Sequence, residues 1–207
     1  MEENSLTPVR LTKDQLKAAV DVLADAFRDY PMLSRYYSDK FRREKMTLGF
    51  LAVSVYSGYR YGEVYATSPN LEGIAVWFPP GCYPVSIWEL LRSVPLSVLF
   101  GFVRHGVARM RQIGNYIDST HFRLAPFPHW YLQALGVAPA HQGKGFSSFL
   151  LRDMFKRIER EGMPCYLETF DRENVAIYEH LGFRVVEQSA IPGTGLTNWA
   201  MLRDRSG

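Results

Sequence analysis

The residues Gln142-Gly143-Lys144-Gly145-Phe146-Ser147 form a glycine turn between a strand-like and a helix-like stretch of the sequence. A strand that enters a helix through glycines exposes backbone N–H groups at the positive end of the helix, and this geometry suits a phosphate. Glycine matters because a side chain would block a close approach and disfavour some of the dihedral angles. Gly143 and Gly145 are therefore predicted to bind phosphate, although a plain turn would also use them. Lys144 could reach the phosphate or point to water.

Two familiar phosphate-binding motifs do not fit this turn. A P-loop needs a glycine five residues before Gly143 and a Ser or Thr after Lys144, but Ala138 and Gly145 occupy those positions. A dinucleotide fingerprint that starts at Gly143 would need a third glycine where Ser148 stands. What remains is a glycine turn directly after a strand that ends in Leu135-Gly136-Val137.

Hydrophobic periodicity and turn residues predict the elements that position this turn. Strands are expected at 7–11, twice within 62–80, and at 129–137, 165–170, 183–191 and 196–202; helices are expected at 16–30, 38–59, 146–162 and 174–181. Thr12 and Gln15 match a capping box before the first helix, and Pro31 is expected to end that helix. Gly182 suits the left-handed position after the 174–181 helix, with Phe183 packing back onto it.

Composition narrows the classes of function. The net charge of +3, from 24 basic and 21 acidic side chains, is too mild to favour nucleic acid or an anionic membrane as a partner. The chain has only two cysteines, Cys82 and Cys165, and its N-terminus lacks a signal-peptide pattern, so a cytoplasmic location is expected. The five histidines show no metal-ligand spacing, so no metal is expected.

The length of 207 residues fits a single domain spanning 1–207. Within it, residues 84–125 contain helical stretches, three glycines and Pro95, and they are expected to form a helical insert. Its most apolar part, 94–103, is about half as long as a membrane span requires and is expected to be a buried or lid-like helix.

A second stretch, 174–183, contains Asn174, Tyr178 and Gly182-Phe183. Together with the glycine turn it resembles the GNAT acetyltransferase superfamily, whose first motif reads Arg/Gln-x-x-Gly-x-Gly/Ala. Gln142 and Gly145 match that motif, and Ser147 replaces the usual Gly or Ala. The resemblance extends to the puromycin N-acetyltransferase-like branch, through segments 10–31, 74–80, 136–145, 166–183 and 198–201.

The resemblance implies a mixed α/β fold. Its central twisted sheet would have about seven mostly antiparallel strands flanked by helices, splayed between the fourth and fifth strands, with the insert before the fourth. It also implies acetyl-coenzyme A as co-substrate, without a metal. The bulged strand at Leu135, Gly136 and Val137 would pair with the pantetheine arm like an extra strand. The remaining coenzyme-binding residues implied are Gln142, Gly143, Lys144, Gly145, Phe146, Ser147, Asn174 and Tyr178.

Acetyl transfer from a thioester to an amine needs a neutral nucleophile, stabilisation of an oxyanion, and a hydrogen bond or proton for the leaving thiolate. By resemblance Tyr178 lies near the sulfur, and a phenol with a pKa of about 10 is protonated at neutral pH; the alternative is an aromatic ring packed under the sheet. Backbone donors at 135–137 are candidates for the oxyanion, with Gly136 serving either a close backbone approach or strand packing.

For the base that accepts the amine proton, the sequence offers Glu168, with two interpretations. Glu168 is a carboxylate at the end of a largely apolar strand, where burial would raise its pKa and make it a better base, directly or through water. It could equally be a salt-bridged structural glutamate. By resemblance Tyr30 would line the acceptor side, or it simply packs at a helix end.

The function predicted is an N-acetyltransferase that moves the acetyl group to a primary amine of a small molecule by direct attack in a ternary complex. An acetyltransferase for a protein or peptide amine and a non-catalytic acyl-coenzyme A sensor are the alternatives. A sensor would need neither Tyr178 nor Glu168. No nucleic acid or membrane partner is expected, and a homodimer is left open.

Overall fold

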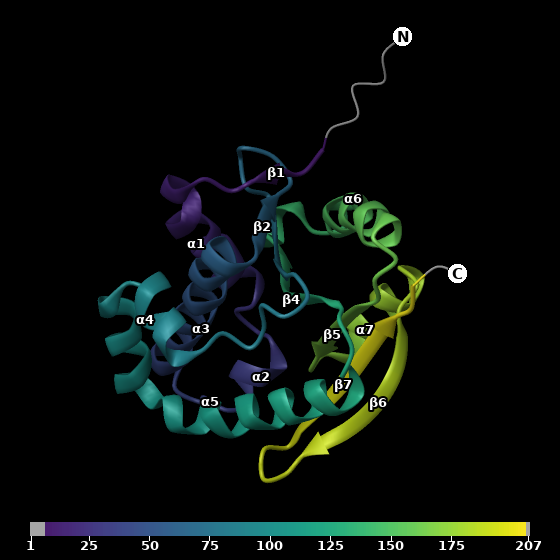
Figure 1. Ribbon diagram of the computed structural model, residues 1–207. Coiled ribbons are helices and arrows are strands. Elements are labelled where there is room, and N and C mark those ends of the chain that lie inside the picture. The colour runs from purple at the N-terminus through teal and green to yellow at the C-terminus, as the bar shows by residue number, and fades with distance from the viewer. Residues whose placement is uncertain (1–6, 206–207) are drawn as a thin grey trace.

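The structure, a computed structural model, describes residues 7–205, with the side chains of 105–109 outside the description. In this part of the chain, a seven-stranded sheet has the order β1-β2-β3-β4-β5-β7-β6 (Figure 1). Neighbouring strands are antiparallel except β4 and β5, which are parallel. The strands are β1 (Val9–Arg10), β2 (Glu63–Ala66), β3 (Gly73–Phe78), β4 (Trp130–Val137), β5 (Cys165–Thr169), β6 (Arg184–Ile191) and β7 (Leu196–Arg203). The predicted fold class is confirmed.

Helices cover both faces of the sheet. They are α1 (Leu16–Ala26), α2 (Pro31–Ser34), α3 (Lys40–Tyr61), α4 (Ile87–Ser93), α5 (Leu96–Leu124), α6 (Phe146–Arg160) and α7 (Arg172–His180). In Figure 1, α1 and α3 lie on one side, α6 and α7 lie on the other, and α5 runs along the bottom toward the β6–β7 hairpin. Side-chain caps fix the starts of α3, α4 and α7. Asp39 accepts from the Arg42 N–H (2.8 Å), Ser86 from the Glu89 N–H (3.3 Å), and Asp171 from the Glu173 N–H (3.0 Å).

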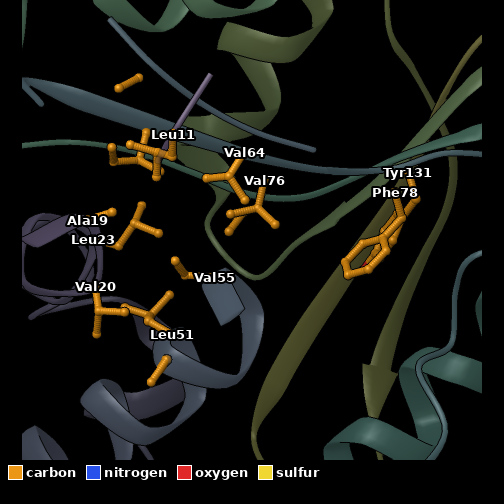
Figure 2. Close-up of a cluster of buried hydrophobic side chains, with 14 of the residues drawn as sticks. Leu11, Ala19, Val20, Leu23, Leu51, Val55, Val64, Val76, Phe78 and Tyr131 are labelled. Atoms are coloured by element: carbon orange, nitrogen blue, oxygen red, sulfur yellow. The ribbon is translucent and has the colours of Figure 1, made fainter. Parts of the chain in front are cut away.

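Side-chain alternation along the strands divides the core into two layers. On one face of the sheet, Val64, Val76 and Tyr131 belong to a buried cluster with Leu23 of α1 and Val55 of α3 (Figure 2). The opposite face is covered by the buried stripe of α6, whose spacing is that of an amphipathic helix. These residues are Leu150, Leu151, Met154, Phe155 and Ile158, and they pack with Leu132 of β4, Leu167 of β5 and Tyr178 of α7.

The pairing between β4 and β5 is short. Only Trp130–Cys165 and Tyr131–Tyr166 are in register, so the strands part beyond Tyr131 and Tyr166. The space between residues 132–137 of β4 and 167–169 of β5 is named here the β4–β5 wedge. On its other edge β4 pairs with β3 and skips one residue, Gln133, which forms a bulge. The predicted splay therefore coincides with a bulge that bends β4 away from β5.

Two local expectations were wrong. Pro31 does not simply stop the first helix; it occupies the first turn of the short helix α2, where a missing N–H does no harm. The insert is helical, and it holds α4 and one unbroken helix of 29 residues, α5. For 94–103, a buried or a lid-like helix was expected, and the buried alternative is wrong, because Leu96 and Phe100 are each 69% exposed. Phe102, on the other side of the helix, packs near Gly49 of α3.

No helix in residues 7–205 combines the length and apolar content needed to cross a membrane.

Gly136 of β4 offers a direct test of how tightly α1 packs on the sheet. A Cβ atom there would lie 2.8 Å from Leu23 Cδ2 and 3.0 Å from Ala26 Cβ, closer than real contacts allow. We expect Gly136→Ala to lower the free energy of unfolding by about 1–3 kcal/mol because the core is overpacked. Urea denaturation measures the change.

Gly114→Ala in α5 is the matched control for this test. Nothing lies within 4 Å of the position of its Cβ, and the residue is inside a helix. We expect it to raise the free energy of unfolding by about 0.5–1 kcal/mol through helix propensity. Equal effects of the two substitutions would contradict this account of α1 packing.

Candidate active site

A cleft of about 800 Å³ opens where β4 and β5 part, a volume suited to a sizeable organic ligand. It is bounded by the end of α1, the end of β4, the glycine turn before α6, and the start of α7. Its lining includes Tyr30, Leu135, Gly136, Val137, Gln142, Gly143, Gly145, Phe146, Ser147, Asn174 and Tyr178. The structure thus brings the two sequence motifs, which are about thirty residues apart, to one cavity.

The glycine turn has the backbone conformation that its composition suggests. Gly143 has φ 75° and Gly145 has φ 80°, and both lie in the left-handed region. A Cβ at either position would meet nothing within 4 Å, so conformation rather than space calls for glycine. Gly145 is also the N-cap of α6, and no side chain caps this end. The first N–H groups of α6 are therefore available to a ligand in the cleft.

The edge of β4 that faces the wedge supplies further backbone groups. The Ala138 N–H donates to the Glu72 carbonyl on the β3 side (2.8 Å). Because successive residues of a strand point their backbone groups to opposite edges, Leu135 and Val137 direct theirs toward the wedge. The Gln142 side chain donates to the Val137 carbonyl (3.1 Å), which agrees with that direction. Gly136 faces β3 and α1, so packing accounts for this glycine.

A helix-ending motif holds Tyr178. After α7, Gly182 takes φ 85° and its N–H donates to the Glu179 carbonyl (3.0 Å), while the Phe183 N–H donates to the Tyr178 carbonyl (3.0 Å). This is a Schellman motif, and the Phe183 ring packs edge-on to the Tyr178 ring at 5.8 Å between centroids. Both expectations for Gly182 and Phe183 are confirmed. The Tyr178 ring is thereby fixed with its phenol in the cleft.

Burial raises the pKa of Tyr178 above its ordinary value, with a smaller contribution from Tyr30. The group therefore stays protonated at neutral pH and can donate a hydrogen bond. No hydrogen bond between its hydroxyl and another described residue is found, so this donor is available to a ligand.

Tyr30 links α1 to the end of β5. Its hydroxyl accepts from the Phe170 N–H (2.8 Å) and lies 3.1 Å from Thr169 Oγ1. Asn174 Nδ2 donates to the same Thr169 oxygen at 3.5 Å. Desolvation raises the pKa of Tyr30 to about 12, so the phenol remains neutral. Tyr30 lines the cleft, and its hydroxyl is engaged with the Phe170 N–H and Thr169.

Glu168 lies on the opposite face of the sheet from Tyr178. It alternates with Leu167, which packs under α6 and α7, and its carboxylate accepts from the Tyr166 hydroxyl (2.9 Å) and the Tyr131 hydroxyl (3.1 Å). Burial raises its pKa to about 8; the two phenols oppose that shift and Asp118 adds to it. The carboxylate forms no salt bridge within the described part of the chain, so the structural ion-pair reading is not supported.

Two predicted residues lie outside the lining of this cleft. Glu168 faces the other side of the wedge, and the Lys144 ammonium donates to the Ala140 carbonyl (3.0 Å) within its own turn. Conversely, Arg28, Ser148 and Ile177 line the cleft and were not predicted. Ser148 directly follows the glycine turn and Ile177 lies within the second motif, so both could have been found from the motifs. Arg28 lies in the turn after α1, far away in the sequence, and left no local signal.

In residues 7–205, no three His, Cys, Asp or Glu residues are grouped so that they could hold a metal ion.

Comparison with known proteins agrees with this geometry. The structure resembles that of histone acetyltransferase HPA2 and related acetyltransferase from Corynebacterium glutamicum, with a TM-score of 0.66, 21% identity and 98% of each chain covered. It also resembles arylalkylamine N-acetyltransferase 2 from Aedes aegypti, with a TM-score of 0.59, 11% identity, and 98% of this chain and 100% of that chain covered. The fold is therefore an acetyltransferase fold.

Sequence comparison gives the family. The sequence model of the acetyltransferase (GNAT) family matches residues 97–183. An uncharacterized N-acetyltransferase of Schizosaccharomyces pombe is 31% identical over 186 residues, covering 86% of this chain and 73% of that protein. The chain belongs to the GNAT acetyltransferase family, and it is an acyltransferase.

The family uses acetyl-coenzyme A, and the cleft fits that molecule. The free N–H groups at the start of α6 suit its pyrophosphate, and the backbone of Leu135 and the Val137 N–H, which point toward the wedge, suit an amide-bearing arm.

Gly145 tests the assignment of the phosphate end. Because φ is 80° there, Gly145→Ala forces a left-handed alanine, at about 1–2 kcal/mol, and turns the first N–H groups of α6 away. We expect the Kd for coenzyme A, measured by isothermal titration calorimetry, to rise about tenfold.

Gly162→Ala provides the matched control, because φ is 62° and the residue follows the far end of α6. It should carry a similar backbone penalty and leave the Kd unchanged. An unchanged Kd in Gly145→Ala would rule out the glycine turn as the pyrophosphate site.

Proposed function

We propose that this acetyltransferase transfers the acetyl group to a primary amine of a small molecule, by direct attack in a ternary complex. The observation that carries the proposal is the placement of Glu168 and Tyr178 on opposite faces of the sheet, next to the β4–β5 wedge. An amine could approach from the Glu168 face while the sulfur leaves on the Tyr178 face.

The pKa directions favour this division of roles. A carboxyl with a pKa of about 8 can accept a proton from an ammonium and release it again near neutral pH. The raised pKa of Tyr178 makes it a hydrogen-bond donor rather than an acid that ionises. In the proposed step the amine nitrogen bonds to the acetyl carbon, the carbon–sulfur bond breaks, and Glu168, directly or through water, takes the amine proton. Tyr178 donates a hydrogen bond to the departing thiolate, and the backbone N–H of Leu135 or Val137 stabilises the oxyanion.

Direct attack is favoured over a covalent acetyl-enzyme by the positions of the thiols. No cysteine is among the described residues that line the cleft. Cys165 is buried beneath α6, and burial raises its pKa, so its thiolate is not available as a nucleophile.

The insert supports a small acceptor rather than an extended peptide. On the Glu168 side α5 is tied to the β6–β7 hairpin: the Tyr116 hydroxyl donates to Ser189 (2.7 Å), and the Gln112 amide donates to the Pro192 carbonyl (2.8 Å). A peptide needs an open groove, and these bonds close one side of it. We also infer membership of the puromycin N-acetyltransferase-like branch from the segments that resemble it, and a cytoplasmic location from the cysteine usage.

The function is tested by free-thiol release from acetyl-coenzyme A in the presence of small primary amines and, separately, of lysine and N-terminal peptides. We expect release with at least one small amine. Release with peptides alone would replace the proposal by a peptide acetyltransferase. Tight coenzyme binding without release by any acceptor would indicate a sensor.

Tyr178→Phe removes the phenol and keeps the ring that packs on Phe183. We expect kcat to fall about a hundredfold while the Kd for coenzyme A stays within a factor of about two, because the lost interaction acts on the leaving group. The partly exposed Tyr59, on α3, gives the control variant Tyr59→Phe, with wild-type kcat expected. Full activity of Tyr178→Phe would remove Tyr178 from the mechanism.

Glu168→Gln tests the base through pH. Since the ionised form accepts the proton, kcat/KM of the wild type should rise with pH through about 8, and this transition should be absent from the variant. The pKa of Glu168 is higher in the folded than in the unfolded state, so the wild type loses stability as the pH rises from 4.5 toward 8. The variant lacks this carboxyl, so its Tm should increase relative to the Tm of the wild type over the same pH range. An unchanged transition near pH 8 in Glu168→Gln would show that another group is titrating.

A further inference from the structure

A group of three tyrosines and two carboxylates lies behind the wedge, on the Glu168 face of the sheet. It consists of Tyr83, Asp118, Tyr131, Tyr166 and Glu168 and is named here the acid–aromatic cluster. The Tyr83 ring centroid is 4.5 Å from that of Tyr131, which in turn is 6.2 Å from that of Tyr166. The insert supplies Asp118 through α5, so this group joins the insert to the proposed base.

The only hydrogen-bond donors to the two carboxylates are phenols, as far as the described residues show. Tyr83 donates to Asp118 (2.9 Å), and Tyr131 and Tyr166 donate to Glu168 (3.1 and 2.9 Å). Neither carboxylate has a Lys or Arg within salt-bridge distance in that part of the chain. The nearby Arg123 is paired with Glu187 at 2.8 Å. The Asp118 carboxylate also disfavours the ionised form of Glu168, and so contributes to the raised pKa of Glu168.

The neighbouring histidines do not supply the missing positive charge. His121 stacks on Tyr83 with ring centroids 5.2 Å apart, and its Nε2 lies 2.6 Å from His129 Nε2. Burial lowers the pKa of His121 to about 3 and also lowers that of His129, so both rings are neutral at physiological pH. The cluster therefore has two carboxyl groups and three phenol rings but no cation of its own.

Buried polar groups without partners occur on the strands next to the cluster. Asn198 of β7 is fully buried, and neither its Oδ1 nor its Nδ2 has a hydrogen-bond partner. Glu168 pairs across the sheet with Ala200, so Asn198, two residues along, projects from the same face as a diagonal neighbour of Glu168. At the bulge of β4, Gln133 Oε1 is also buried and unpartnered. Buried polar atoms of this kind normally have partners.

An ammonium group suits the carboxylates, the aromatic rings and the unpartnered oxygens Asn198 Oδ1 and Gln133 Oε1. It carries three donors and no acceptor, is attracted to carboxylates, and is stabilised by aromatic faces. We propose that the acid–aromatic cluster is the acceptor subsite and that it selects acceptors with two amino groups. This inference rests on the proposed amine acetyltransferase function. One nitrogen is deprotonated near Glu168 and attacks, while the second stays protonated and binds at Asp118.

The wild-type test compares acceptors that differ only in the second amino group. Putrescine is matched with butylamine, and cadaverine with pentylamine, in thiol-release assays with acetyl-coenzyme A. We expect kcat/KM to be about tenfold higher for a diamine than for its matched monoamine. Ratios near one in both pairs, with measurable turnover, would overturn the diamine subsite while leaving the proposed function intact.

A binding measurement distinguishes failure of the diamine subsite from failure of the proposed acetyltransferase function. Calorimetry with the protein saturated by coenzyme A should detect putrescine or cadaverine at a Kd about tenfold below that of the matched monoamine. If no amine releases thiol but a diamine binds, the subsite stands and the proposed function fails. If neither diamine binds better than its monoamine, the subsite is wrong.

Asp118→Asn tests whether Asp118 is the carboxylate that binds the second amino group of the acceptor. It keeps the shape and the Tyr83 contact but removes the charge, so KM for the preferred diamine should rise about tenfold with kcat and the monoamine KM little changed. Asp153→Asn, an exposed charge on α6, is the matched control and should leave both KM values unchanged. If Asp118→Asn raises KM equally for the diamine and the monoamine, Asp118 has only a structural role and the diamine subsite is wrong. The Tm of both variants is measured to detect a loss of stability.

Discussion

The parting of β4 and β5 after two residue pairs is the constraint on which the site depends. A parallel pair that continued would bury the backbone groups of Leu135 and Val137 in the sheet. Because β4 bulges at Gln133 and leaves β5, those groups face a cleft instead. The same divergence leaves room for the unpaired N-terminus of α6 and brings α7 against the opposite wall. The cleft thus follows from strand geometry, and the side chains refine it.

The sheet also separates two chemical environments. The phenol of Tyr178 is fixed on the α6–α7 side by the Schellman motif and the Phe183 ring. Glu168 belongs to the α1–α3–α5 side, where phenols rather than cations surround it. Burial acts on both groups in the same sense and raises both pKa values, but the outcome differs. The phenol becomes a more secure donor, and the carboxyl comes into the range where it can exchange protons near neutral pH.

The sequence predicted features that depend on neighbouring residues, but not contacts between residues that are far apart in the chain. The positive φ of Gly143 and Gly145, the cap at Gly182, and the alternating strands each leave a signature within a few residues. The acid–aromatic cluster has none, because Tyr83 and Asp118 are 35 residues apart and meet only after α5 has folded back. The continuity of α5 was also hidden, since its interior glycines weaken a helical pattern that packing against α3 restores. Lys144 shows the converse. Its position in the sequence makes it a plausible phosphate ligand, but its ammonium donates a hydrogen bond to the Ala140 carbonyl within its own turn.

The raised pKa of Glu168 ties stability to acceptor binding through the same charge. Burial favours the protonated carboxyl, so the ionised form is destabilised in the free protein. A cation that arrives beside it reverses this preference, because an opposite charge within a few ångströms favours ionisation. In the proposed function, an incoming ammonium therefore helps to create the base that deprotonates it, and a neutral ligand of the same shape would not. Selection for a charged acceptor and activation of the base are, on this argument, one electrostatic event.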